Sequence, residues 1–77
     1  MPDHAEPMRQ IARRVRQARL VAGWSQQDLA GHAGVSRPSV ARIEAGEDVS
    51  TATLTKIVGA LGRAVEVTDG NAGVKDA

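Results

Sequence analysis

Cysteine is absent from the sequence, and this excludes both a disulfide and a cysteine-based zinc site. A chain of 77 residues is long enough for one compact core, because two cores would each be too small to be stable. With neither a disulfide nor a zinc ion, that core must be stabilised by helix packing or by a second subunit. The missing cysteines therefore predict a single domain and favour an oligomer.

Long apolar runs are also absent from the sequence. No stretch approaches the ~20 apolar residues that span a bilayer. Residues 1–6 place no cationic region before an apolar stretch, as a secretory signal would. We therefore expect a cytoplasmic protein with no membrane partner.

Residues suited to catalysis are scarce. An enzyme needs a positioned nucleophile, base or metal. The sequence offers two scattered histidines, His4 and His32, and no pair of acids on one predicted helix. We predict that the protein has no catalytic site, no metal site and no cofactor.

The charged residues divide along the chain, although the formal net charge is +1. Residues 8–43 contain seven arginines and one acid, Asp28, whereas residues 44–77 contain six acids and three cations. The seven arginines are Arg9, Arg13, Arg14, Arg16, Arg19, Arg37 and Arg42. A basic half beside a mildly acidic half indicates a polyanion on one side and a different contact on the other. The alternative is a solvated, arginine-rich helix.

Apolar spacing and capping residues predict helices over residues 8–22, 26–32, 37–45 and 51–61. Ser25, Ser36 and Ser50 each precede one of these helices and can accept hydrogen bonds from the N–H groups of its first turn. Glycines follow the four helices at positions 23, 34, 46 and 62, as is typical where a helix ends sharply. Pro38 is compatible with a helix start, because the first turn needs no N–H donor.

The segment after the fourth helix, residues 63–68, alternates as a short strand does. Val65 and Val67 fall on one face of that strand. Since nothing else in the sequence is typical of a strand, we expect the segment to pair with its copy in a second chain, which makes these valines dimerisation residues. Residues 1–7 are predicted to form a flexible arm and residues 69–77 a disordered tail.

Residues 26–44 place two short helices about four residues apart, with polar side chains at the start of the second. This geometry puts a helix end into a DNA major groove. The segment resembles the Xre/Cro helix-turn-helix family, which includes the lambdoid phage repressors, and the resemblance extends over about residues 11–61. The packing positions of that family are occupied by Leu29, Ala30, Gly34, Val35, Val40 and Ile43. The resemblance implies an all-α, phage-repressor-like four-helix domain, here with a short C-terminal β-strand, and we assign the helix-turn-helix domain to residues 8–68.

The resemblance also implies which residues bind DNA. Gln26 matches the family glutamine that opens the second helix and hydrogen-bonds a DNA phosphate. The exposed positions of the recognition helix are occupied by Arg37, Pro38, Ser39 and Arg42. An arginine can donate two N–H groups to O6 and N7 of guanine, so Arg37 is the first candidate for reading a base and Arg42 the second. Either arginine could instead hold only a phosphate.

Other residues depart from the family pattern or match it in a structural role. Pro38 stands where many relatives carry Gln or Thr and cannot make their hydrogen bond, although its ring could touch a thymine methyl. Gly31 and His32 replace long polar side chains, and we interpret His32 as a surface residue. Arg19 and Glu44 match a structural ion pair that ties the first helix to the third in the phage repressors. The alternative for this pair is two solvated charges.

Together these features predict a sequence-specific transcriptional regulator, and specifically a repressor. We expect a homodimer that binds a palindromic operator in double-stranded DNA and is associated with the nucleoid. The layout and length also resemble the short HipB-like antitoxins, in which a phage-repressor-like unit is followed by a strand that pairs across a dimer. Such proteins bind a toxin protein as well as operator DNA. The sequence leaves both interpretations open.

Overall fold

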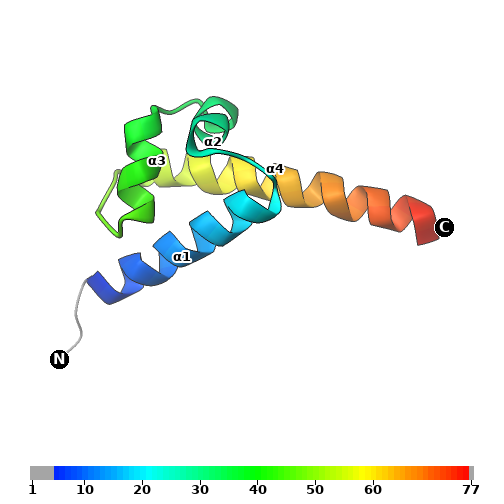
Figure 1. Ribbon diagram of the computed structural model, residues 1–77, viewed down its shortest axis with the longest axis horizontal. Helices are drawn as coiled ribbons and strands as arrows, with labels where there is room; N and C mark the ends of the chain where they lie inside the picture. The colour runs from blue at the N-terminus through cyan, green and yellow to red at the C-terminus, as the bar shows by residue number, and fades with distance from the viewer. Residues whose placement is uncertain (1–4, 77) are drawn as a thin grey trace.

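The computed structural model describes the backbone of residues 5–76 and the side chains of residues 6–65, and this part of the chain forms four helices (Figure 1). The helices are α1 (Ala5–Val21), α2 (Gln26–Ala33), α3 (Arg37–Glu44) and α4 (Thr51–Asp76). α3 contacts each of the other three helices. The second half of α4 extends beyond the rest of the molecule (Figure 1). The predicted all-α class with four helices is confirmed.

One apolar core joins the helices. Leu29 of α2, Val40 and Ile43 of α3 and Ile57 of α4 are fully buried, and Val15 of α1 packs with them. Complete burial of one such side chain stabilises the folded state by about 1.5–3 kcal/mol. α3 therefore has one side anchored in the core, and this fixes which of its residues remain at the surface.

The start of α2 is set by a capping box at Ser25. The Ser25 hydroxyl accepts a hydrogen bond from the backbone N–H of Asp28 at 2.9 Å, and the Asp28 carboxylate accepts one from the N–H of Ser25 at 2.8 Å. The hydrogen bond from the Ser25 backbone, with that from its hydroxyl, lowers the pKa of Asp28. The predicted cap is confirmed, and it positions the residue that follows it, Gln26.

The turn between α2 and α3 depends on Gly34. Its φ of 71° lies in the left-handed region, where a residue with a Cβ is disfavoured. The N–H of Val35 then donates to the carbonyl of Ala30 at 3.0 Å, which closes the end of α2. Ser36 caps α3 by accepting from the N–H of Ser39 at 3.3 Å, and Pro38 lies in the first turn as predicted.

The first helix begins earlier in the structure than the sequence predicted. α1 begins at Ala5 instead of residue 8. Pro7 then lies in the first turn, where a missing N–H donor costs nothing. Residues 1–4 of the predicted flexible arm lie outside the described residues.

The predicted strand over residues 63–68 is wrong. The chain continues as helix through residues 63–65 and on to Asp76, within α4. A lone strand in one chain leaves its N–H and C=O groups unpaired, whereas a helix pairs them internally. Gly62 was expected to end this helix but lies inside it, because a glycine in a helix interior costs only about 1 kcal/mol. Most of the predicted tail, residues 69–77, therefore has helical backbone as well.

Candidate nucleic-acid interface

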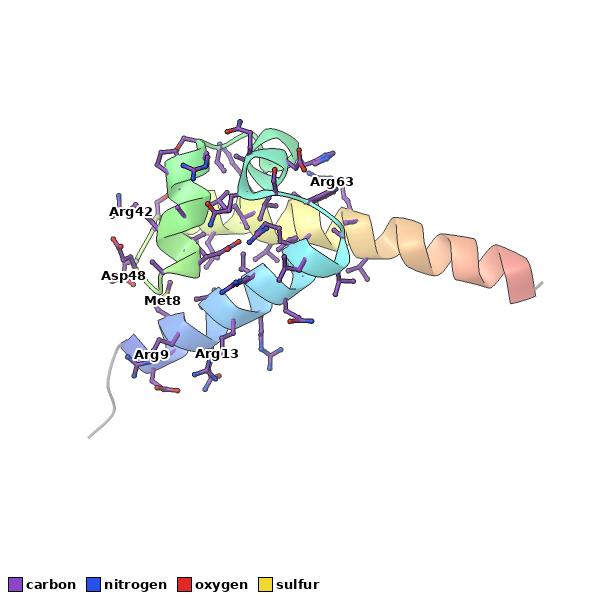
Figure 2. All side chains as sticks on the ribbon, viewed as in Figure 1. Met8, Arg9, Arg13, Arg42, Asp48 and Arg63 are labelled. Carbon is purple, nitrogen blue, oxygen red and sulfur yellow. The ribbon has the colours of Figure 1, made fainter. Side chains whose placement is uncertain are left out.

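The two sides of α3 have opposite characters. Val40 and Ile43 are fully buried against the core, whereas Arg37, Pro38 and Arg42 are exposed. Arg42 lies at the outer edge of the molecule beside α3 (Figure 2). The structure thus brings three of the predicted DNA-binding residues to one solvent-facing surface.

Ser39 and Gln26 are less accessible than these three residues. Ser39 is half-buried, and its hydroxyl lies 3.0 Å from that of Ser36, within the cap of α3. Gln26, the first residue of α2, is half-buried, and its side-chain N–H donates to the Glu44 carboxylate at 3.2 Å. The side chain of Gln26 is therefore held against the end of α3.

Arg19 and Glu44 form an ion pair between α1 and α3. The guanidinium donates to both carboxylate oxygens, from Nε at 2.6 Å and from Nη2 at 2.9 Å. Its Nη1 donates to the carbonyl of Trp24 at 2.9 Å. The two side chains are 10% and 7% exposed. The pair therefore joins three segments of the chain in a place that water scarcely reaches.

The electrostatics of Glu44 result from opposing effects. Burial raises its pKa, but the hydrogen bonds from Arg19 and Gln26 favour the charged form more strongly, and the pKa of Glu44 is lower than usual. The nearby charge of Arg16 acts in the same direction. In turn, the hydrogen bonds between Arg19 and Glu44 raise the pKa of Arg19. Both members of the pair are therefore charged at neutral pH.

A model of a protein family described as "Helix-turn-helix domain" matches residues 10–70 of this chain. The chain belongs to the helix-turn-helix domain family. No curated protein matches it. The matched residues contain α2, α3, the turn at Gly34 and the Arg19–Glu44 pair. They also extend past residue 62 into the part of α4 that was predicted to be a strand.

Arg42, on the exposed side of α3, has an acidic neighbour at a long distance. Its Nε lies 3.6 Å from a carboxylate oxygen of Glu47, and the two side chains are 61% and 60% exposed. A pair this open to water contributes at most about 1 kcal/mol to stability. Arg42 therefore remains available to another anion.

Three arginines from the basic half of the sequence lie together on α1. Arg9, Arg13 and Arg16 line shallow hollows between α1 and the end of α3, together with Glu44 and small residues of α3. Their spacing of four and three residues places them on one flank of a helix. The sequence shows that spacing, but it does not show that the end of α3 lies beside this flank of α1.

Other kinds of site find no support in the described residues. No three histidine, cysteine, aspartate or glutamate side chains gather there in a way that could hold a metal ion. His32 stacks on Trp24 with ring centroids 4.1 Å apart. Among the helices searched, no segment is both long and apolar enough to cross a membrane.

Proposed function

We propose that this chain is a sequence-specific DNA-binding transcriptional regulator of the Xre/Cro kind, acting in the cytoplasm at the nucleoid, and that α3 enters the major groove. The observation that carries the proposal is the division of α3 into a side buried at Val40 and Ile43 and an exposed side with Arg37 and Arg42. A helix anchored in this way presents a rigid polar surface. Rigid presentation is what base recognition requires, because a hydrogen bond to a base edge tolerates little displacement.

The roles of the individual residues follow from their places on the helices. Arg37 is the first residue of α3, the end that reaches base edges in helix-turn-helix complexes. In the proposal it donates two N–H groups to a guanine, and Arg42 makes a second contact further along the groove. Gln26 stands at the start of α2, where the helix dipole favours a phosphate. Pro38 adds an apolar contact.

We further propose that the protein acts as a homodimer on a palindromic operator and represses transcription. Strand pairing cannot form the dimer if residues 63–65 stay helical, but Val65 remains a candidate. Val58 and Val65 are each about half exposed and lie two turns apart on α4, hence on one face. Two copies of this face related by a two-fold axis would cover both valines. The side chain of Val67 lies outside the described residues.

The antitoxin alternative loses part of its basis. It depended on a strand after the fourth helix, and residues 63–65 are helical. Binding of a toxin protein stays a prediction from the sequence resemblance. Recovery of a toxin-like protein with the purified chain would bring it back.

The direct test of the proposal is selection of bound duplexes from a random DNA library. We expect an enriched site with two inverted half-sites whose centres are about 10–10.5 base pairs apart, because a dimer places its recognition helices in successive major grooves on one face. A library that emerges without any enriched sequence would refute sequence-specific binding.

A further inference from the structure

A groove between α1 and α3 lies next to the proposed recognition surface. Its lining includes small residues, among them Ala41 of α3 and Ala45, which follows the end of α3. Arg13 and Arg16 of α1 line its side, and Gln26 lies at one end. The two hollows that make up the groove share Arg16, Glu44 and Ala45, so they lie next to each other. We call this feature the α1–α3 groove.

The charges of the α1–α3 groove favour an anion. Arg13 and Arg16 are exposed and form no hydrogen bond or ion pair among the described residues. Glu44 is the one acid in the groove lining, and it is bound on both oxygens by Arg19. Glu44 thus has a guanidinium N–H on each oxygen, whereas Arg13 and Arg16 have no direct partner in the described part of the chain, where only the longer-range charges of Glu6 and Glu44 act on them.

The position of the groove indicates which anion it takes. Ala41 and the C-cap residue Ala45 follow Arg37 at intervals of four residues, so all three lie on one line along α3 and its C-terminal end. A nucleic-acid strand beside an inserted α3 would therefore pass along this line. Small side chains on α3 leave room for a phosphate backbone to approach, and the arginines stand where they would reach its oxygens.

We infer that Arg13 and Arg16 bind the phosphate backbone of the same DNA whose major groove receives α3, so that α1 forms a second part of the interface. The inference rests on the proposed DNA-binding function and adds a surface to it. These arginines carry affinity and not base preference, because a phosphate is identical in every sequence. The partner is one strand of the bound duplex, continuous with the phosphate held by Gln26.

The chain contains a matched control for this inference. Arg14 is also an exposed arginine of α1, between the other two in sequence, but it lines neither hollow of the groove. A helix turns by about 100° per residue, which directs Arg14 away from the flank that carries Arg13 and Arg16. Replacing any of the three with glutamine removes the same charge from the same helix.

The test measures binding to the selected duplex against salt concentration for the wild type, Arg13→Gln, Arg16→Gln and Arg14→Gln. The slope of log K against log salt is negative. Removing one arginine from a phosphate makes it less steep by about 0.9, or by about 1.8 when both subunits of a dimer carry the substitution. We expect this reduction for Arg13→Gln and Arg16→Gln and an unchanged slope for Arg14→Gln. The ratio of binding to selected and scrambled duplexes should stay at its wild-type value in all three variants.

The possible failures are distinguishable. Equal slopes in all variants and the wild type, or equal reductions in all three variants, would overturn the groove inference while sparing the proposed function. A changed preference between selected and scrambled duplexes would also overturn it, since base reading would then involve α1. A wild-type protein whose binding does not depend on salt would overturn both proposals.

Discussion

Arginines have different roles in two regions of α1 and α3. One region is the buried contact between the helices at Arg19 and Glu44, which we call the α1–α3 junction, and the other is their exposed surface. At the junction, Arg19 is buried and donates three hydrogen bonds, two to the Glu44 carboxylate and one to the carbonyl of Trp24. On the surface, Arg13, Arg16, Arg37 and Arg42 are exposed. A buried guanidinium without its partner is strongly destabilising, whereas a hydrated one costs little and can exchange water for phosphate. The comparison shows that the surroundings of an arginine, and not its residue type, determine whether it is held in the structure or accessible to an anion.

The largest expected effect is at the junction. Arg19→Ala should destabilise the fold by about 3–5 kcal/mol, because Glu44 would be left buried and charged without its partner. Chemical denaturation followed by circular dichroism measures the change. Arg14→Ala is the surface control and should stay within about 0.5 kcal/mol of the wild type.

A double-mutant cycle separates the pair from simple loss of packing. The variant with both Arg19→Ala and Glu44→Ala should be much less destabilised than the sum of the single variants, since neither charge is then left alone. Additive single effects would show that the two side chains do not depend on each other.

A smaller effect is expected from acid, and it distinguishes the junction from the surface. The pKa of Glu44 is lowered in the folded state, so its contribution is complete above the unfolded carboxyl pKa of about 4.3 and is lost as the pH falls through the lower folded value. Glu44→Gln should remove this part of the acid sensitivity. The pKa values of Glu6 and Asp28 are also lowered, but this affects the wild type and Glu44→Gln alike. Identical acid denaturation profiles of the wild type and Glu44→Gln would show that the charge of Glu44 does not contribute to stability.

The smallest effect on stability is expected at the exposed ion pair. Glu47→Gln should change the free energy of unfolding by less than about 1 kcal/mol, because Arg42 and Glu47 are both well hydrated. The same substitution should strengthen DNA binding slightly, as it removes a negative charge beside Arg42. Destabilisation as large as that of Arg19→Ala would remove the contrast between the two pairs.

Local signals made α2 and α3 predictable from the sequence. Each is preceded by a serine cap and followed by a turn with a glycine of positive φ, and both predicted ranges differ from the structure by one residue. The burial of Val40 and Ile43 likewise follows from their three-residue spacing. With that side fixed, the exposure of Arg37 and Arg42 follows as well.

The rest depended on information that the sequence does not carry locally. Six alternating residues fit a strand or the end of a helix, and Gly62 looks like a stop signal although a helix can accommodate it. The α1–α3 groove forms only when α1 packs beside the end of α3. The spacing of Arg13 and Arg16 indicates that they lie on one flank of a helix. No pattern in the sequence indicates that Ala41 and Ala45 lie next to that flank.

The most direct test of the central claim is the sequence preference of Arg37→Ala, measured on the selected duplex and on single base-pair variants of it. We expect a loss of about 1–3 kcal/mol on the selected duplex and a relaxed preference at one base pair in each half-site. Gln26→Ala should weaken binding to all sequences alike, because we propose that Gln26 contacts a phosphate. If Arg37→Ala also weakened every sequence equally, Arg37 would hold only a phosphate, and the exposed side of α3 would not read DNA sequence through this residue.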